Sequence, residues 1–435
     1  MKIANYIEKE KALRRVTYAL YIYFFLLIFE GALRRWVLPG FSAPLLVIRD
    51  PIAIYILITA WQFHFIKING YLIGLILISF ISLNTTFFFG HGNIFIAIYG
   101  LRILLIHFPL LFVIESVFKK KEIFNIAKWM IYLSIPMFIL IVFQFYSPQS
   151  AWVNKGLGEN FEGGGFVGAL GYYRPPGTFS FTNGVVLFFT FVSPFVLWGF
   201  TDKINIPKWV LYLSLFCLIL SIPFSISRAL LFATIATSIF FMFFIFRNIL
   251  LFFRIIFVVI AIFTSLYFLS ASNFLGTSIN VFKERFTTAN ETEGGLENVI
   301  FVRYLGGLKN AFNSSGSQPI WGQGIGMGTN VAGQLISGKR EFLIAEGEWG
   351  RVLGELGPIL GLLFILIRIV ISIKMARIAF LQFLSGNILP WLLAANVIIN
   401  IIQGQWAQPT SLGFSIFFGG VLLASRNLRE APNNV

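Results

Sequence analysis

Residues 123–146 read IFNIAKWMIYLSIPMFILIVFQFY, and Lys128 is the one charged residue among them. Folded as an α-helix, this stretch would be about 36 Å long, which exceeds the roughly 30 Å hydrocarbon core of a bilayer. Apolar stretches of this kind recur along all 435 residues, of which 57% are hydrophobic and only 12% are charged. Soluble domains carry about 25% charged residues. The sequence therefore predicts an integral membrane protein.

The breaks between the apolar stretches predict an all-α polytopic membrane protein with about twelve transmembrane helices. Two connections are long, 147–182 and 272–349, and we expect them to be outer-side loops. The larger loop, between the ninth and tenth spans, separates a transmembrane part at 1–271 from a last transmembrane part at 350–435. The expected spans are 16–36, 45–65, 70–89, 93–118, 123–146, 183–201, 208–226, 229–247, 250–271, 350–373, 387–405 and 410–426.

The distribution of lysine and arginine sets the expected orientation, because these residues concentrate in cytoplasmic loops. With the N-terminus inside, every predicted inner loop and both termini carry basic residues. Arg368 is counted among these cytoplasmic basic residues. The charged start at 1–15 then reads as a cytoplasmic tail rather than as a cleaved signal peptide. We therefore expect both termini in the cytoplasm and both long loops outside.

A second group of basic residues lies on the predicted outer side or in the outer half of a span. Most are arginines, whose planar guanidinium binds phosphate through several donors at once. Charges at membrane depth are costly and usually functional, so we interpret the group as an outer phosphate-binding site. Ion pairs with Glu30, Asp50 and Glu284, together with ordinary solvation in loops, are the alternative. The residues are Arg34, Arg35, Arg49, Arg102, Lys155, Arg174, Arg228, Lys283, Arg285, Arg303, Lys309, Lys339, Arg340 and Arg351.

Charge and cysteine content exclude several classes of function. The net charge of +15 sits beside membrane spans, which favours anionic lipid headgroups or an anionic substrate over nucleic acid as the partner. The single cysteine, Cys217, excludes a disulfide within the chain and a cysteine-based metal site. The outer segments contain no Asp-x-Asp motif, so we expect neither a metal nor another cofactor.

Arg174 belongs to the first outer motif, in the stretch YYRPPGTFSFTN at 172–183. The two prolines after it fix the backbone in an extended form, and Gly177 and Thr178 provide a turn before a helix that begins at Asn183. This order would present a guanidinium at the outer surface beside a helix N-terminus, which itself favours anions. A plain entry from loop to helix is the alternative.

Three further motifs follow on the outer side. Ser227-Arg228-Ala229 joins the seventh and eighth spans, and its arginine is either a phosphate ligand or a side chain that reaches for the interface. Arg303 lies in the large loop, in the stretch FVRYLGG. The run GQGIGMG at Gly322–Gly328 lacks the strand-then-helix context of a dinucleotide-binding fold, so we expect a re-entrant turn at the membrane surface.

Carboxylates lie at the end of the large loop, in the stretch EGEWGRVLGELG at 346–357. On a helix, Glu348, Arg351 and Glu355 would share one face, so they either pair with one another or shape a site. A carboxylate in a partly apolar outer site could act as a general base, which makes Glu346 and Glu348 the candidates. Arg351 is also a candidate phosphate ligand.

The order of these motifs resembles the bacterial O-antigen polymerase and O-antigen ligase superfamily over about residues 165–365. The ligases of that superfamily place a histidine shortly before the Glu-Leu-Gly motif, where this chain has Glu346. The histidines here all lie in the first quarter of the chain. A polymerase therefore fits better than a histidine-dependent ligase. The resemblance is carried by Arg174–Phe179, Ser227–Ala229, Arg303, Pro319–Gly326 and Glu355–Gly357.

The resemblance implies a metal-independent glycosyltransferase of the bacterial inner membrane. It would polymerise oligosaccharide repeat units carried on undecaprenyl pyrophosphate, to make the O-antigen of lipopolysaccharide or an exopolysaccharide. Lipid-linked glycans would be donor and acceptor, with membrane lipid and a chain-length regulator protein as further candidate partners. The alternatives are a ligase, which transfers the glycan to the lipid A core or to a protein, and a flippase for the same lipid-linked oligosaccharide.

The resemblance also assigns roles to the motif residues. The pyrophosphate would be bound by Arg174, Arg228, Arg303 and Arg351, and the charge that develops on it would be stabilised by Arg174 and Arg228. Glu346 or Glu348 would take the proton from the acceptor hydroxyl.

Overall fold

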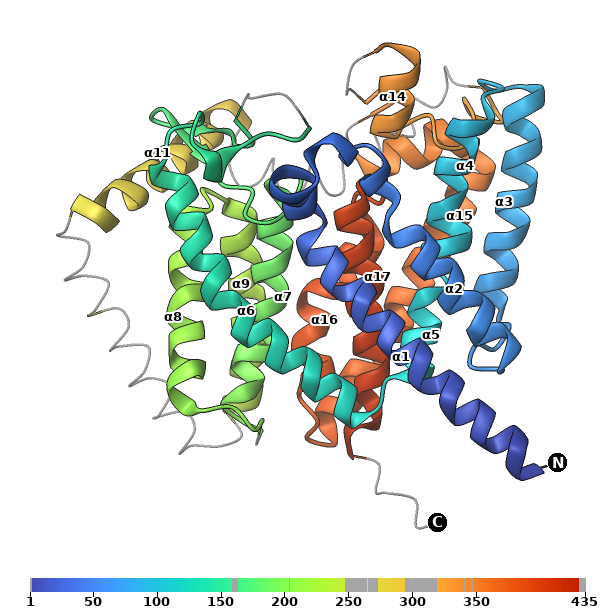
Figure 1. Cartoon of the computed structure of the whole chain (residues 1–435), viewed down its shortest axis with the longest axis horizontal. Helices are drawn as coiled ribbons and strands as arrows, with labels where there is room; N and C mark the ends of the chain where they lie inside the picture. Colours follow the sequence, from blue (N-terminus) through green and yellow to red (C-terminus); the bar gives the residue numbers. More distant parts are fainter. Residues whose placement is uncertain are drawn as a thin grey trace.

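The computed structural model describes residues 2–158, 163–202, 204–246, 264, 273–293, 319–338, 342–345 and 347–429. Over this part of the chain the protein is a bundle of α-helices with one two-stranded antiparallel sheet (Figure 1). The helices are α1 (Lys2–Ala32), α2 (Arg49–Gln62), α3 (Gly70–Phe88), α4 (Ile94–Arg102), α5 (Leu110–Val117), α6 (Lys120–Tyr146), α7 (Asn183–Gly199), α8 (Lys208–Phe224), α9 (Arg228–Ile245), α11 (Asn273–Glu293), α14 (Asn330–Ile336), α15 (Glu348–Leu384), α16 (Leu389–Gln403) and α17 (Pro409–Ala424).

Shorter elements connect these helices. Two are π-helical turns, η1 (Leu33–Val37) and η4 (Ile103–His107). The 3-10 helices are η2 (Pro39–Phe41), η3 (Pro44–Val47), η5 (Trp152–Asn154) and η7 (Ser425–Arg429), and the strands are β1 (Phe166–Ala169) and β2 (Tyr172–Arg174).

Eight helical segments among the described residues are long and apolar enough to cross a membrane. Three shorter apolar helices, α7, α8 and α16, accompany them. Together these helices occupy every predicted span except the ninth, 250–271, which lies outside the described residues apart from residue 264. A predominantly helical protein with helices of membrane-spanning length is thus confirmed. The eight segments are Tyr6–Val37, Pro44–Gln62, Gly70–Phe88, Ile94–Val117, Lys120–Tyr146, Arg228–Ile245, Glu348–Leu384 and Pro409–Leu428.

The helices expose large apolar side chains on the outside of the bundle. On α3, for example, Ile76, Leu77, Phe80 and Phe88 are each more than half exposed. A continuous apolar surface of this kind is unusual on a soluble monomer, whereas lipid tails would cover it without cost.

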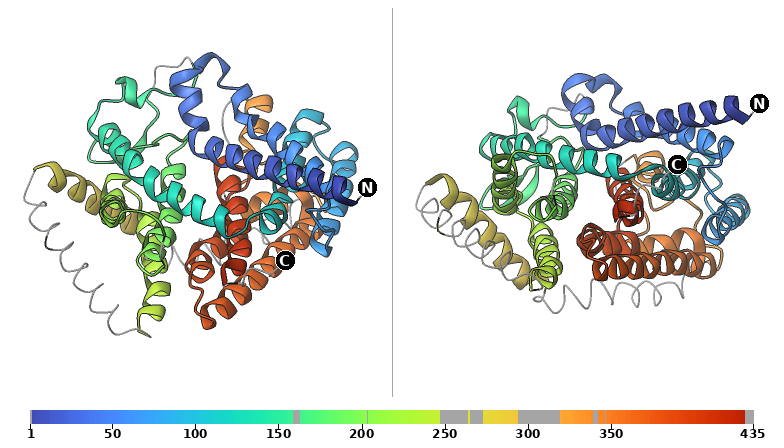
Figure 2. Two further views of the ribbon diagram at one scale, coloured as in Figure 1. Left: turned by 60° about the horizontal axis from the view of Figure 1, so that its bottom comes forward. Right: turned by 90° about the horizontal axis from the view of Figure 1, so that it is seen from below.

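The start of α1 and the end of α17 lie at one end of the bundle, and the β1–β2 hairpin, α11 and α14 lie at the opposite end, here called the loop end (Figure 1). Seen from below, α17 occupies the centre (Figure 2). It packs against α1, α5, α7, α15 and α16. Rings interdigitate there, as between Phe191 and Phe418, whose centroids are 4.4 Å apart. The core therefore surrounds the last long helix of the chain.

Both long connections contain secondary structure that the sequence did not predict. The connection 147–182 includes η5 and the β1–β2 hairpin, and 272–349 includes α11 and α14. The helix α11 is polar along most of its length, but Leu275, Ser278 and Val281 are buried on one face. This face packs on α8 and β1, and that tertiary contact stabilises a helix whose composition resembles a loop.

The segment 175–179, which follows Arg174, is buried inside the bundle between α1 and α6. Gly31 makes the approach to α1 possible, because a Cβ at this position would lie 2.3 Å from the backbone of Phe179. The Thr178 hydroxyl donates to the Ile28 carbonyl at 2.6 Å, which fixes the segment to α1. From α6, the amide of Gln144 accepts from Gly177 N at 2.7 Å and donates to Gly177 O at 3.1 Å. The backbone after Arg174 is thus fixed on two sides.

Replacement of Gly31 by valine should strongly destabilise the protein, because the new side chain would collide with backbone that cannot move aside. We expect a loss of about 3 kcal/mol or more in folding free energy, seen as a lower midpoint of thermal unfolding in detergent. Gly40→Val is the matched control, since a Cβ at Gly40 has no atom within 4 Å. Equal midpoints for the two variants would contradict the close packing of α1 on residues 178–180.

Candidate functional site

Arg174 ends strand β2, opposite Phe166 of β1, at the loop end. Its side chain is partly buried, and its Nε atom is buried with no hydrogen-bond partner. Among the described residues, no acceptor or carboxylate contacts its guanidinium. Guanidiniums in such surroundings normally pair with an acid, so Arg174 is a cation without a counter-charge in this part of the chain.

Arg285 lies near Arg174, and Arg228 lies near Phe286, because α11 crosses the loop end and packs on β1. The positive charge of Arg285, together with burial, lowers the pKa of Arg174 to about 10, and burial is the larger cause. Arg228 is the first residue of α9, where Ser227 accepts a hydrogen bond from Leu230 N and caps the helix. Its guanidinium lies 5.9 Å from the centre of the Phe286 ring of α11. These three residues, Arg174, Arg228 and Arg285, form the outer arginine cluster.

The outer arginine cluster has the properties of an anion site. Arg285 is a like charge that, with burial, disfavours the charged form of Arg174, and an anion bound between the two arginines would offset this repulsion. Arginine forms paired hydrogen bonds with phosphate oxygens, and the helix N-terminus at Arg228 adds a favourable dipole. The sequence had named Arg174 and Arg228 as phosphate ligands and had placed Arg285 only in the wider outer group. Arg303, the third predicted ligand in this region, lies outside the described residues.

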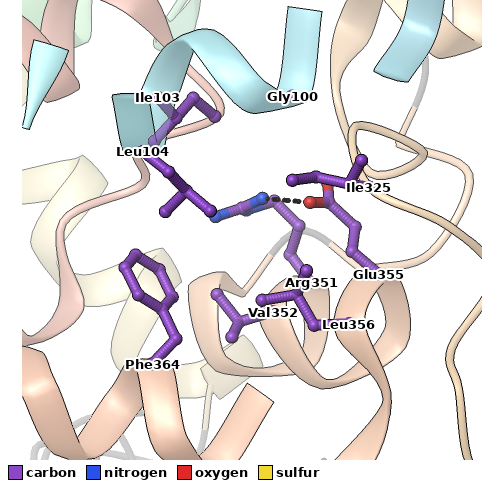
Figure 3. A pocket seen from close by; sticks show the side chains of 9 residues that line it. All are labelled: Gly100, Ile103, Leu104, Ile325, Arg351, Val352, Glu355, Leu356 and Phe364. Carbon is purple, nitrogen blue, oxygen red and sulfur yellow. Dashed lines mark hydrogen bonds and ion pairs between the residues drawn. The ribbon is translucent and has the colours of Figure 1, made fainter. Parts of the chain in front are cut away.

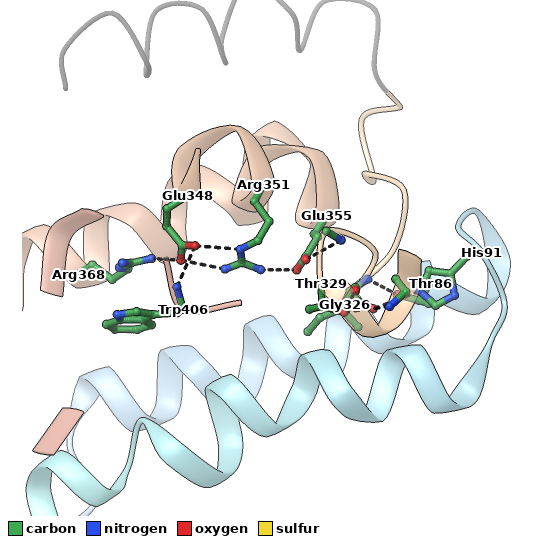
Figure 4. A network of polar contacts seen from close by, with 12 residues as sticks. Thr86, His91, Gly326, Thr329, Glu348, Arg351, Glu355, Arg368 and Trp406 are labelled. Atoms are coloured by element: carbon green, nitrogen blue, oxygen red, sulfur yellow. Dashed lines mark hydrogen bonds and ion pairs between the residues drawn. The ribbon is translucent and has the colours of Figure 1, made fainter. Parts of the chain in front are cut away.

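A second group of charged residues lies at the start of α15 (Figure 4). Arg351 donates to both oxygens of Glu348 at 2.9 Å and to Glu355 at 2.7 Å. Glu348 also accepts from Arg368 and, at 3.1 Å, from Trp406 N. All four charged side chains, Glu348, Arg351, Glu355 and Arg368, are buried, and we call them the paired network. Its two acids and two bases balance.

The paired network answers the question that the sequence left open for this face of α15. Glu348, Arg351 and Glu355 do pair with one another, and both oxygens of Glu348 accept hydrogen bonds. These contacts give Glu348 and Arg351 a structural task, and their roles as general base and phosphate ligand stay predictions. The network is also far from the outer arginine cluster, since α11 and α15 lie at different sides of the bundle (Figure 1). The other predicted base, Glu346, lies outside the described residues.

Arg368 was wrongly placed among the residues of the inner loops. It lies within α15 with 1% of its side chain exposed, and it donates to Ile401 O at 2.7 Å and Gly404 O at 2.9 Å. Its guanidinium stacks 3.8 Å from the Trp406 ring centre. Arg368 therefore satisfies carbonyl groups at the end of α16, where helix carbonyls lack partners. A positive charge within an apolar stretch could have indicated a buried acidic partner. Because Arg368 was counted with the basic residues of the cytoplasmic segments, this sign was missed.

The glycine run forms a tight turn, and this turn docks on a break in α15. That the turn is re-entrant at the membrane surface stays a prediction. Gly322, Gly324 and Gly326 all have positive φ, which side chains rarely allow. Gly357, with φ of +75°, interrupts α15, and so the carbonyls of Gly354 and Glu355 are free to accept from Gln323 N and Gly324 N. Gly328 N donates to the Glu355 side chain at 2.9 Å. The Gly-rich motif and the Glu-Leu-Gly motif thus form one structural unit.

The opposite face of the turn contacts the connection between α3 and α4. Ile325 N donates to the Thr86 hydroxyl at 2.9 Å, and His91 N donates to Gln323 O at 3.1 Å. The Nδ1 atom of His91 accepts from Asn93 N, so Nε2 carries the proton and donates to Ile325 O at 3.1 Å. The turn is therefore fixed between α3–α4 and α15 (Figure 4).

A small pocket lies beside the paired network, between α4 and α15 (Figure 3). Leu104, Ile325, Arg351, Glu355 and Phe364 are among its lining residues. Its volume of about 10 Å³ is near the lower limit for one water molecule. It has no room for a sugar or a phosphate.

A third group of charged residues joins α1, α2 and α4. Glu30 lies 3.2 Å from Arg34 and 3.4 Å from Arg49, and Arg102 lies 3.0 Å from Asp50. For these arginines the alternative of ion pairing with Glu30 and Asp50 is correct. The sequence did not predict that His107 joins them, at 3.0 Å from Asp50 and 2.9 Å from the Tyr23 hydroxyl.

No protein-family model, curated protein or solved structure matches this chain. Within the described residues, no group of three or more His, Cys, Asp or Glu side chains could hold a metal ion. The superfamily resemblance therefore rests on the sequence motifs alone.

Arg368→Met should destabilise the protein, because it leaves the buried Glu348 carboxylate short of one cation. The expected cost is about 3–5 kcal/mol, measured as a fall in the midpoint of thermal unfolding. Arg14→Met is the control: its ion pair with Glu10 is exposed, and the midpoint should stay near that of the wild type. If Arg368→Met unfolds at the wild-type temperature, the paired network does not stabilise the bundle.

Proposed function

We propose that this chain is a membrane glycosyltransferase that polymerises oligosaccharide repeat units carried on polyprenyl pyrophosphate. The observation that carries the proposal is Arg174, a partly buried guanidinium without an acceptor among the described residues. Its neighbour Arg285 opposes its charge, so the free site is electrostatically unfavourable. A pyrophosphate group would relieve both the missing partner and the repulsion.

The proposed reaction needs positive charge where a leaving group departs. The acceptor hydroxyl oxygen attacks the anomeric carbon of the donor glycan, and the bond from that carbon to the pyrophosphate oxygen breaks. The pyrophosphate leaves with the electron pair, and the outer arginine cluster stabilises the charge that develops on it. A base takes the hydroxyl proton, and Glu346 is the candidate that we favour, because both oxygens of Glu348 accept hydrogen bonds from Arg351. We keep Arg303 as a proposed third phosphate ligand.

The proposed orientation places the loop end on the outer face of the bacterial cytoplasmic membrane. About twelve spans and two cytoplasmic termini would give this arrangement. It is supported by the position of the start of α1 and the end of α17 at the end of the bundle opposite the hairpin and α11 (Figure 1). The donor and acceptor would then meet where lipid-linked glycans are exposed.

Arg174→Met and Arg228→Ala should each abolish polymer formation while the protein stays in the membrane. Each removes a guanidinium that would stabilise the leaving pyrophosphate, and loss of one such group typically costs about 100-fold or more in rate. Polymer made from purified lipid-linked repeat units would be followed on gels. Arg15→Met, which removes an exposed arginine of α1, is the control. Polymers of wild-type length from both site variants would exclude the assignment, and transfer to lipid A core alone would identify a ligase.

Arg174→Met should also raise thermal stability in the absence of substrate. The folded-state pKa of Arg174, about 10, is below its ordinary value. Folding therefore disfavours its charged form at neutral pH, and this penalty begins to shrink as pH rises above about 10, where the folded form loses its proton before the unfolded form does. A methionine carries no such penalty, so at pH 7 its midpoint should exceed that of the wild type, and the difference should shrink above pH 10. A lower midpoint at pH 7 would show that Arg174 has a stabilising partner.

A further inference from the structure

Trp152 is one of the most exposed large apolar side chains at the loop end, with 70% of its surface accessible. One face of its indole stacks on Trp36, with ring centroids 5.5 Å apart and planes inclined by 27°. Trp36 Nε1 donates to the Trp152 carbonyl at 3.1 Å, so the pair is held by a hydrogen bond as well as by stacking. A flat aromatic surface backed by a second ring is therefore presented outward.

The loop that carries Trp152 is held firmly in place. Asn154, 1% exposed, donates from its side chain to the carbonyls of Gln144 and Ser147 at 2.9 Å and of Pro148 at 3.2 Å. The hydrogen bonds of Asn154 already fix the loop in the free protein. Binding of a ligand to Trp152 would therefore cost little conformational entropy.

The Trp152 loop and the Arg174 segment share two anchors. Gln144 Nε2 donates both to Val153 O, beside Trp152, and to Gly177 O, each at 3.1 Å. The π-helical turn η1 makes the same connection from α1, since Arg35 donates to Gly177 O at 3.3 Å while Trp36 stacks on Trp152. The fold therefore fixes the Trp152 loop relative to the segment that follows Arg174.

We infer that Trp152, backed by Trp36, is a stacking platform for a pyranose ring of the glycan whose pyrophosphate binds at Arg174. This inference rests on the proposed function and adds a sugar subsite to it. One face of a pyranose carries several C–H groups with partial positive charge, and the face of an indole is negative. A glycan attached to the pyrophosphate extends away from it, so a sugar contact is needed beside the phosphate site.

A membrane-interface position is the main rival, because tryptophan is enriched where headgroups begin. Trp152 lies in η5, between α6 and the hairpin, rather than on the lateral face of a span. Gln144 also connects the Trp152 loop to the segment after Arg174, because it donates to Val153 O and to Gly177 O. A tryptophan that only anchors the protein in lipid does not require this connection. We therefore assign the surface to glycan.

The inference is tested by binding of the purified protein in nanodiscs to an array of bacterial oligosaccharides. Wild type should bind at least one glycan, Trp152→Ala should lower that binding by about tenfold, and Trp152→Phe should retain most of it. Trp209→Ala, which removes another exposed tryptophan at the start of α8, is the matched control. Absence of glycan binding by wild type, or equal binding by Trp152→Ala, would overturn the platform.

Two further measurements separate this inference from the proposed function and from the rival. Binding of inorganic pyrophosphate, followed by thermal shift, should be unchanged in Trp152→Ala and lost in Arg174→Met, so the two sites can fail independently. A spin label on Ser150→Cys in a Cys217→Ser background should be reached by a water-soluble nickel relaxant. Contact with membrane-dissolved oxygen instead would place the platform in lipid and overturn the inference.

Discussion

The cost of burying a charge shapes this bundle more than any other constraint. A charge moved out of water costs several kcal/mol unless a counter-charge accompanies it. The paired network meets this condition, because its two glutamates and two arginines satisfy one another. In doing so it joins the start of α15 to the glycine turn and to the end of α16. The apolar helices pack around a few such polar connections.

Within the described part of the chain, Arg174 departs from this condition. Arg174 has no acceptor among the described residues, and Arg285 adds a like charge. Gly31 and Gln144 fix the backbone segment that follows it. Unfavourable local arrangements that a rigid fold maintains are concentrated at functional sites. The contrast between a neutral network and this cation therefore supports the anion site that we propose, and the Trp36–Trp152 pair is the sugar subsite that we infer beside it.

The sequence predicted the helices well, because apolar stretches of bilayer length are a strong local signal. It also predicted that α7 begins at Asn183, and its eighth span began at 229, one residue after the start of α9 at Arg228. A turn at the glycine run was expected as well. It could not predict α11, whose polar composition gives no sign of a buried face until α8 and β1 are in place. The motif around Arg174 distinguished this residue from most other outer arginines. The sequence could not show that Arg351 forms ion pairs and Arg174 does not, because such pairs depend on how the chain folds. Arg368 was wrongly assigned to the inner loops from the distribution of basic residues. That distribution does not show that Arg368 pairs with Glu348, 20 positions away in the chain.

The most direct test of the central claim is a cryo-electron microscopy structure of the protein in a nanodisc with undecaprenyl pyrophosphate bound. We expect phosphate oxygens within hydrogen-bond distance of Arg174, with Arg228 and Arg285 around the same group. We also expect Glu348 and Arg351 to keep the hydrogen bonds that join them in the free protein. Pyrophosphate density at Arg351, with Arg174 still lacking a partner, would contradict the proposed anion site.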